Sequence, residues 1–455
     1  MLPEGFLKRA EALLGEEYAD FIGSLEGEAV RGLRANLIKT NTATVSGLFG
    51  DALTPIPYRL NGFIIDGEVR IGRTPEHHSG MIYVQDPGAM AALCATEIKP
   101  DFKVLDVCAA PGGKSSQAAE LLGKGGFLLS NEYVPKRAKI VVGNFERLGV
   151  RNAVVTSLDS SELGEMFDGY FDLVIVDAPC SGEGMFRKSE EALNEWSEEN
   201  VLACAERQKE ILENVAGTVR AGGRLLYSTC TSSIEENEGV VNHFLKGHPE
   251  YRLIKLRDEL SAATKNGIRA EGIDCEGIEL CRRFYPHVSR GEGQFVALLE
   301  RENDGKKQTI LYKDGTKPLN KRERELAEGL LGDLLVEMPE GRLAKYGENI
   351  VLISHGVPIP PKSVFMSGVL VGELSGNMIK PSHQLFSAYG HLFKRRVELS
   401  RGDKRADEYL SGLEISAEVE NGFCAVLYEG AALGGGKASG GRVKNHYPKG
   451  LRNKG

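Results

Sequence analysis

The sequence predicts an α/β protein whose central part is a doubly wound, mostly parallel sheet. Three observations support this prediction. Strand patterns alternate with helical patterns from about residue 76 to residue 300, as in sheets whose parallel strands are connected by helices. Phe171–Val176 is an almost unbroken apolar run, which is typical of a central strand buried on both faces. The first strand of the region ends in a glycine-rich turn, where a backbone can approach a ligand closely.

The elements of this region follow one another in a regular order. We expect its strands at 103–108, 127–130, 152–156, 171–176, 224–228 and 294–299. We expect its helices at 115–122, 135–148, 197–219 and 234–245. Pro135 stands at the start of the second helix, where a missing N–H group is tolerated.

The chain is too long, at 455 residues, for one hydrophobic core. We expect four parts: an N-terminal α/β module at 1–75, the doubly wound domain at 76–300, a connecting α/β domain at 301–375 and a β-rich module with a basic tail at 376–455. The first part contains a helical pattern at 3–14 and a strand pattern at 35–39. The last closes in the glycines at 434–436.

Composition indicates a soluble globular protein, with 41% hydrophobic and 26% charged residues. No apolar stretch approaches the roughly 18 residues of a membrane span, and the N-terminus lacks a signal-peptide pattern. We therefore expect a cytoplasmic protein without membrane contact. The eight cysteines stand singly, without a C-x-x-C pair, so we expect neither a metal site nor a disulfide framework.

The formal net charge of -8 argues against a nucleic-acid partner, but the charge is unevenly distributed. The segment 431–455 has no acidic residue and six basic ones: Lys437, Arg442, Lys444, Lys449, Arg452 and Lys454. A local basic surface attracts phosphates whatever the total charge. A solubilising tail explains the same cluster equally well.

The loop after the first strand predicts a cofactor site. It reads Cys108, Ala109, Ala110, Pro111, Gly112, Gly113, Lys114. Glu132 follows Gly112 by 20 residues at the end of the next strand, the spacing at which an acidic side chain meets ribose hydroxyls. A dinucleotide site would need G-x-G-x-x-G, and a P-loop would need a glycine where Cys108 stands. We therefore expect a nucleoside cofactor without phosphates, which disfavours a nicotinamide-dependent oxidoreductase.

Asp159 is a further candidate for this site. It follows the strand at 152–156, where it could accept a hydrogen bond from an adenine amino group. It also begins the pattern Asp159-Ser160-Ser161-Glu162, which is typical of a helix cap. The sequence leaves both interpretations open.

Two cysteines follow adjacent predicted strands. The central strand runs into Asp177-Ala178-Pro179-Cys180, and the strand at 224–228 runs into Thr229-Cys230, 50 residues later. The carboxyl ends of neighbouring parallel strands meet at one edge of a sheet, where ligands bind. A single loop cysteine is usually structural, but two cysteines that face a cofactor loop indicate a catalytic site.

These motifs resemble the signature motifs of the NOL1/NOP2/Sun family of RNA cytosine methyltransferases: Ala109–Lys114, Asp177–Gly184 and Ser228–Thr231. Flanking motifs of the family are similar to Tyr83–Pro87 and Gly291–Phe295, so the resemblance covers about 76–300. The ends are similar to a bacterial branch of the family that modifies small-subunit ribosomal RNA. Arg34–Lys39 resembles its N-terminal module, and Lys444–Arg452 its PUA-like C-terminal domain.

The resemblance implies a Rossmann-like core that binds S-adenosyl-L-methionine and methylates carbon 5 of a cytosine in 16S ribosomal RNA. It implies that Cys230 attacks carbon 6 as a thiolate and that Cys180 serves the loss of the carbon 5 proton. Asp177 would hold the ring nitrogen edge and face the cofactor. The role of Lys114 stays open. Related DNA enzymes use the cysteine of a Pro-Cys pair, here Cys180, as nucleophile, but the Thr229-Cys230 pattern favours Cys230.

The resemblance also implies RNA-binding modules at 1–75 and 376–455, a target base flipped out of any helix, and a monomer that acts on small-subunit ribosomal RNA. Two alternatives stay open: a transfer RNA cytosine methyltransferase, and a silent RNA-binding ribosome-assembly factor. The joint presence of Cys180, Cys230, Asp177 and the glycine loop disfavours the second. Phe284, Tyr285 and His287 could stack on bases, although core packing is the favoured interpretation.

Overall fold

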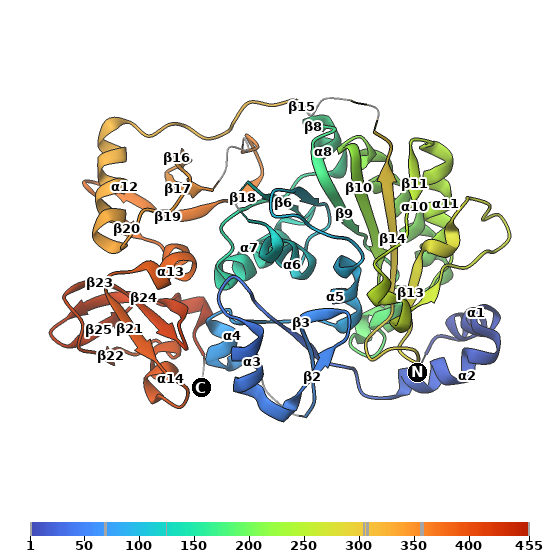
Figure 1. Ribbon diagram of the computed structural model, residues 1–455, viewed down its shortest axis with the longest axis horizontal. Helices are drawn as coiled ribbons and strands as arrows, with labels where there is room; N and C mark the ends of the chain where they lie inside the picture. Colours follow the sequence, from blue (N-terminus) through green and yellow to red (C-terminus); the bar gives the residue numbers. More distant parts are fainter. Residues whose placement is uncertain are drawn as a thin grey trace.

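A computed structural model describes residues 2–67, 71–123, 125–303, 305, 309–354 and 359–453. Figure 1 shows a large sheet in the middle of the molecule, the C-terminal parts on one side of it and helices α1 and α2 on the other. Within the described residues, no helix combines the length and apolar character needed to cross a membrane. Lys454, the last predicted basic residue of the tail, lies outside the described residues.

The centre of the large sheet is parallel, as the sequence predicts. Its five parallel strands have the order β10-β9-β5-β6-β7 and these bounds: β5 Lys103–Asp106, β6 Phe127–Asn131, β7 Ala153–Thr156, β9 Phe171–Asp177 and β10 Val219–Thr229. Five antiparallel strands extend the sheet beyond β10 and β7: β11 Tyr251–Leu253, β12 Lys265–Asn266, β13 Arg282–Phe284, β14 Gln294–Arg301 and β18 Val364–Ser367. The sheet is therefore mixed rather than mostly parallel.

Helices cover both faces of this sheet. On one face lie α5 Pro87–Cys94, α6 Gly113–Leu121 and α7 Pro135–Leu148, and on the other α8 Ser160–Met166, α10 Glu198–Ala216 and α11 Glu238–Gly247. Alternate residues of one strand serve the two cores: Leu173 and Ile175 pack on one face, and Val174 and Val176 on the other. The continuous apolar run of β9 is explained by this burial on both sides.

One predicted helix of the domain begins later in the structure than the sequence indicates. Helix α7 has the predicted bounds, but α11 begins at Glu238 instead of 234. The residue just before α11, Asn237, bonds to the loop after β10. Its side chain donates to the carbonyl oxygen of Thr231 at 2.9 Å and accepts from Thr229 Oγ1. Polar contacts to the loop after β10 thus replace the first helical turn.

The N-terminal part contains two separate units. Helices α1 Glu4–Leu14 and α2 Tyr18–Glu26 pack through Phe6 and Phe21 against Phe186 and Tyr285 of the central domain. The other unit is an antiparallel sheet of order β2-β3-β1-β4 with two helices, bounded as follows: β1 Gly32–Ala35, α3 Thr42–Phe49, β2 Leu53–Ile56, β3 Arg59–Ile65, α4 Pro75–His78 and β4 Ile82–Val84.

Two predictions for this part need correction. The predicted strand at 35–39 is wrong, because the side chain of Asn36 accepts from the amide of Ile38 and turns the chain just after β1. The predicted end of the module at residue 75 cuts its sheet, because β4 pairs with β1 beyond that point. Arg34 of β1 joins the sheet to the central domain through a buried ion pair with Glu120 of α6.

The C-terminal parts contain helix α12 and two sheets. The first sheet has the order β16-β17-β19-β20 and the second β21-β23-β24-β25-β22. The bounds are α12 Lys321–Leu334, β16 Arg342–Tyr346, β17 Asn349–Ile353, β19 Val369–Ser375, β20 Met378–Pro381, α13 His383–Tyr389, β21 Arg396–Leu399, α14 Lys404–Leu410, β22 Ile415–Ser416, β23 Gly422–Tyr428, β24 Ala431–Ser439 and β25 Arg442–Asn445. The short elements β8 Phe167–Asp168 and β15 Thr309–Ile310 form a pair, and α9 is Glu190–Glu195.

The predicted division at residue 375 falls inside a hairpin. Strands β19 and β20 pair across it through a tight turn in which Gly376 has a φ of 61°. The glycines at 434–436 do not close the module but lie within β24. A Cβ on Gly435 would stand 2.2 Å from the ring of Phe386, so the missing side chain lets α13 pack closely on this strand.

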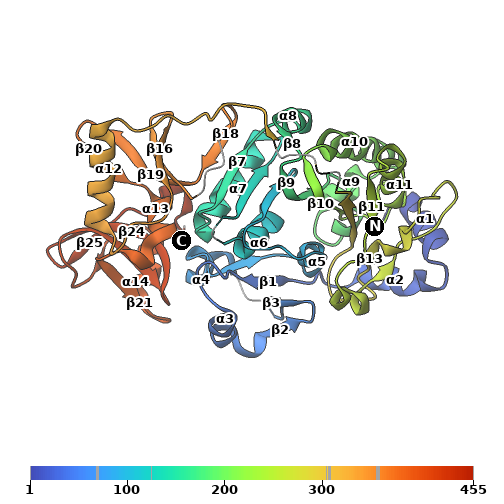
Figure 2. The same cartoon turned by 45° about the horizontal axis from the view of Figure 1, so that its top comes forward.

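The last sheet docks on the N-terminal module. The Nζ atom of Lys39 donates to the carbonyl oxygen of Ser79 (2.8 Å), to Ser387 Oγ (2.8 Å) and to the carbonyl oxygen of Ala432 (3.1 Å). Burial holds the pKa of Lys39 well below its usual value. Figure 2 shows the molecule from another side, with α4 of the N-terminal module facing the C-terminal sheet. Lys39 therefore joins the N-terminal module to the C-terminal part.

Candidate active site

The two predicted cysteines meet at the carboxyl edge of the large sheet. The Sγ atoms of Cys180 and Cys230 lie 3.1 Å apart, and both side chains are half-buried. The pairing of β9 with β10 sets Asp177 opposite Ser228, so the loops that follow these strands leave the sheet side by side. The contact between residues 50 positions apart is thus a consequence of parallel pairing.

Further contacts join the two cysteine loops. The amide of Gly184 donates to the carbonyl oxygen of Cys230 at 2.7 Å, and the hydroxyls of Ser181 and Thr231 lie 3.1 Å apart. A Cβ on Gly184 would stand 2.6 Å from that same carbonyl oxygen. Glycine is therefore required at this position for the loops to approach each other.

The two thiols have different surroundings. The hydrogen bond with Cys230 raises the pKa of Cys180 well above its usual value, and burial and the carboxylate of Glu236 raise it further. Cys180 therefore keeps its proton in the free protein. The assignment of Cys230 as the nucleophile, which rests on the Thr229-Cys230 pattern, stays a prediction.

Asp177 lies beside the thiols and carries three hydrogen bonds. Its Oδ1 accepts from Ser228 Oγ at 2.7 Å and from Gln294 Nε2 at 3.4 Å, and its Oδ2 lies 2.7 Å from Lys114 Nζ. The side chain of Asp177 is 32% exposed and that of Lys114 only 8%. Lys114 thus pairs with Asp177 from the cofactor loop, and its role in the reaction stays open.

The glycine loop has the backbone that the motif requires. Gly112 starts α6 with a φ of 104°, a region that residues with a Cβ rarely adopt. The amide of Gly112 donates to the carbonyl oxygen of Ala109, whose own amide donates to the carbonyl oxygen of Asn131 on β6. Burial raises the pKa of Cys108 far above its usual value, so this thiol lines the loop as an unreactive group.

Glu132 lies where the sequence places it, at the end of β6 and against the loop. Its carboxylate accepts from the amide of Ala110 at 3.3 Å and from the amide of Val134 at 3.0 Å. The residue is 3% exposed. The glycine loop and an acidic side chain thus come together, while the contact of Glu132 with a ribose stays a prediction.

Asp159 forms the helix cap that was one of its two interpretations. Its side chain accepts from the amide of Ser161 at 2.9 Å, and Glu162 completes a capping box at the start of α8. These hydrogen bonds lower the pKa of Asp159. The contact with an adenine stays a prediction.

Two buried polar residues of the cofactor edge were missed from the sequence. Burial raises the pKa of Asp106 to about 7, and Ser115 Oγ donates to its carboxylate at 2.5 Å. Asn131 donates to the carbonyl oxygens of Val107 and Leu158 and so ties the ends of three strands together. Both residues end a strand: Asp106 stands just before the glycine loop and Asn131 just before Glu132. These positions could have identified them from the sequence.

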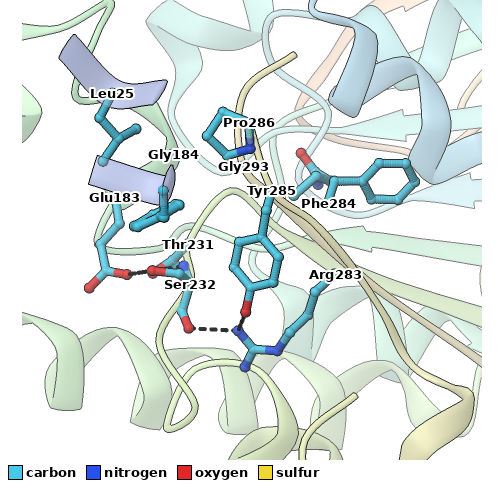
Figure 3. Close-up of a pocket in the computed structure, with 12 residues that line it drawn as sticks. Leu25, Glu183, Gly184, Thr231, Ser232, Arg283, Phe284, Tyr285, Pro286 and Gly293 are labelled. Carbon is cyan, nitrogen blue, oxygen red and sulfur yellow. Dashed lines mark hydrogen bonds between the residues drawn. The ribbon is translucent and has the colours of Figure 1, made fainter. Parts of the chain in front are cut away.

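A small cavity lies beneath the Cys230 loop (Figure 3). Its volume of about 10 Å³ is close to the space that one water needs. Figure 3 shows Tyr285 and Ser232 converging on Arg283, whose Nη1 donates to the carbonyl oxygen of Ser232 at 2.7 Å and to Tyr285 Oη at 3.1 Å. Phe284 and Tyr285 are 2% and 4% exposed, and the His287 ring packs edge-on against Phe21 and at a tilt against Tyr285. Core packing of these rings, the favoured interpretation, is confirmed.

The predicted basic tail contributes to a surface cluster on the last sheet. Lys437 and Lys444 are exposed on β24 and β25. Burial lowers the pKa of His446, and the charges of Lys380, Lys444 and Lys437 lower it further. Lys437 Nζ lies 5.8 Å from the centre of the Phe423 ring, and the His446 ring lies 5.9 Å from it. Cations around a partly exposed aromatic ring are typical of single-stranded RNA sites.

Three family models match the chain. The model described as 16S rRNA methyltransferase RsmB/F matches residues 94–300, that of the N-terminal domain of 16S rRNA methyltransferase RsmF matches 2–87, and that of the methyltransferase RsmF PUA domain matches 396–453. Ribosomal RNA small subunit methyltransferase F of Vibrio campbellii is 30% identical over 475 residues, which cover 99% of this chain and 97% of the relative. The same-named protein of Aeromonas hydrophila is 32% identical over 472 residues, with 99% and 97% covered.

Solved structures resemble about two thirds of the chain. A methyltransferase homolog protein from Pyrococcus horikoshii is 28% identical, with a TM-score of 0.57 over 66% of this chain and 95% of that chain. NSun6 from Pyrococcus horikoshii with SFG is 22% identical, with a TM-score of 0.55 over 66% and 99%. The latter resemblance concerns the fold alone.

Proposed function

Because the chain belongs to the RsmB/F family of 16S rRNA methyltransferases, we propose that it methylates carbon 5 of a cytosine in the RNA of the small ribosomal subunit. The observation that carries the proposal is the pair of thiols 3.1 Å apart, beside a carboxylate that is neutralised from the glycine loop. We further propose that the protein acts as a monomer in the cytoplasm, since one chain supplies all of these groups.

The residues at the carboxyl edge fit S-adenosyl-L-methionine as the cofactor. The loop Cys108–Lys114 offers backbone free of large side chains at Gly112 and Gly113, and Glu132 offers a carboxylate at the end of β6. Such groups suit a nucleoside without phosphates. When bound, S-adenosyl-L-methionine supplies an electrophilic methyl group.

Cys230 acts as the nucleophile in this proposal. Carbon 5 of cytosine is a weak nucleophile, and addition of a thiolate to carbon 6 gives it the character of an enamine carbon. The side chain of Cys230 is half-buried at the sheet edge, so a base must leave its stack to reach it. Asp177, whose charge Lys114 balances, holds the ring nitrogen edge and its proton.

Cys180 removes the proton from carbon 5 after methylation. The pKa of its thiol is raised most by the hydrogen bond with Cys230. Once the sulfur of Cys230 is bonded to carbon 6, it no longer acts as that partner, so Cys180 releases its own proton to solvent more easily. The Cys180 thiolate then takes the carbon 5 proton, the C–H electrons restore the 5,6 double bond, and the Cys230 thiolate leaves. The contact between the thiols thus keeps Cys180 protonated until the adduct has formed.

Two variants test this assignment on small ribosomal subunits from cells that lack the gene. Cys230→Ala is expected to lose both methyl transfer and the covalent adduct. Cys180→Ala is expected to accumulate a protein-RNA adduct that survives denaturing gel electrophoresis. An adduct in Cys230→Ala and none in Cys180→Ala would exchange the two roles.

The terminal parts are proposed to hold the RNA. The cluster of Lys380, Lys437 and Lys444 near His446, with Lys437 over the ring of Phe423, supports phosphate contacts and base stacking. Binding should weaken steeply as salt rises. Bisulfite sequencing of ribosomal and transfer RNA from cells that lack the gene tests the target: loss of 5-methylcytosine from transfer RNA alone would contradict the ribosomal assignment.

A further inference from the structure

A buried carboxylate lies behind the cysteine pair and belongs to none of the motifs discussed above. Glu236, in the turn before α11, is fully buried, as is Gln208 in the middle of α10. Isolated buried carboxylates are costly, so those that persist are held by several donors. Three donors reach Glu236, and two of them come from the residue after Cys180.

The contacts hold the backbone on both sides of Cys180. Glu236 Oε2 accepts from the amide of Ser181 at 2.9 Å, and its Oε1 accepts from the Ser181 hydroxyl at 2.5 Å. Gln208 Nε2 donates to the carbonyl oxygen of Pro179 and to Glu236 Oε2, both at 2.9 Å. Tyr227 Oη lies 3.0 Å from Gln208 Oε1. The residues before and after Cys180 are thus held by two side chains that bond each other.

We propose that Glu236 is a positioning residue for Cys180: with Gln208 it fixes the Pro179–Ser181 segment so that the Cys180 thiol lies against Cys230 and, later, against carbon 5. The inference rests on the proposed function, in which Cys180 is the base. Glu236 acts through Cys180 and touches no reacting atom.

The charge of Glu236 near Cys180 also supports this role. The groups that interact with Cys180 are Cys230 from the loop after β10, Glu236 from the turn before α11 and Tyr227 from β10. Of these, Cys230 and Glu236 raise the pKa of Cys180. A Cys180 thiolate beside Glu236 is therefore a stronger base. Removal of the charge should lower the pH at which Cys180 becomes reactive.

The test separates adduct formation from adduct resolution. Glu236→Gln keeps the size of the side chain and an acceptor for the Ser181 amide but removes the charge. We expect adduct to form within about twofold of the wild-type rate and to resolve about tenfold more slowly, as for the loss of a charged hydrogen bond. Labelled small-subunit RNA from cells that lack the gene, followed on denaturing gels in a single turnover, gives both rates.

A double variant shows whether Glu236 acts through Cys180. In the Cys180→Ala background, Glu236→Gln should add no further change to adduct formation or resolution. Mass spectrometry of iodoacetamide-treated protein should show alkylation of Cys180 at lower pH in Glu236→Gln than in wild type. Glu235→Gln, one residue away and paired with Arg9 instead, is the matched control and should change neither rate. Melting temperature and cofactor affinity report on folding.

The outcomes distinguish the two proposals. No adduct in Cys180→Ala would overturn both. Adduct in Cys180→Ala with normal resolution in Glu236→Gln would overturn the inference about Glu236 alone. Equal slowing of formation and resolution, or a further effect in the Cys180→Ala background, would also overturn it, because Glu236 would then act on the whole fold. If Glu236→Gln fails to fold, Ser181→Ala, which removes the hydroxyl donor to Glu236 Oε1 but keeps the amide donor, must show the same selective slowing.

Discussion

Lys114→Met removes the cation that balances Asp177 and leaves the rest of the glycine loop intact. Lys114 Nζ lies 2.7 Å from Asp177 Oδ2, while Ser228 and Gln294 both donate to Oδ1. Methionine has a similar length and carries no charge. The variant therefore leaves Oδ2 without its charged partner in a site where Asp177 must stay ionised to hold the base.

The expected loss follows from burial. A hydrogen bond between charged groups contributes about 1.5–3 kcal/mol. Asp177 is 32% exposed, so water can replace part of this interaction, and the lower end of about 1.5 kcal/mol applies. Since about 1.4 kcal/mol corresponds to a factor of ten in rate, kcat/KM for RNA should fall about tenfold. Cofactor affinity should stay within about twofold, because the ammonium group points to Asp177.

The assay measures transfer of labelled methyl groups to unmethylated small subunits, together with titration of S-adenosylhomocysteine by calorimetry. Lys321→Met, at a lysine whose side chain is 92% exposed on α12, is the matched control and should leave both quantities unchanged. Normal kcat/KM in Lys114→Met, or a loss confined to cofactor affinity, would refute the assignment of Lys114 to Asp177.

Three further predictions concern stability and redox chemistry. Lys39→Met should lower the free energy of unfolding in urea by about 2–3 kcal/mol, because three acceptors from two regions lose their donor; an unchanged midpoint would contradict the central role of this lysine. Asp106, whose pKa burial raises from 3.8 to about 7, binds a proton more tightly in the folded state. Stability should therefore fall as pH rises from about 4 to 7, by at most about 4 kcal/mol. In Asp106→Asn that part of the slope should vanish from melting curves, and an identical pH profile would contradict it. Diamide should join Cys180 to Cys230, abolish activity and be reversed by dithiothreitol; peptide mapping that finds no such crosslink would contradict their contact.

Much of the central domain could be predicted because its signals are local. Helix α7 has the predicted bounds, since an amphipathic pattern between a proline and a glycine specifies both ends. The juxtaposition of Cys180 and Cys230 could be predicted as well, because residues after adjacent parallel strands share one edge. By contrast, β18 pairs with β7 although more than 200 residues separate the two strands. No periodic pattern in the sequence predicts such a pairing.

Polar networks were the hardest to foresee. Glu236, Gln208 and Lys39 are isolated polar residues in the chain, and each would ordinarily be assigned to the surface. Their partners are carbonyl and amide groups of distant segments. Such contacts have no spacing rule, because they depend on how whole elements pack.

The amino-acid sequence alone predicts the kind of sheet, the glycine loop and the pair of thiols. These features depend on hydrophobic periodicity and on the residues at strand ends, which are local properties of the sequence. Folding in three dimensions raises the pKa of Cys180 and sets which cation balances Asp177. These properties depend on burial and on the charges of Lys114 in α6 and Glu236 before α11, and such groups come close only when the elements pack together.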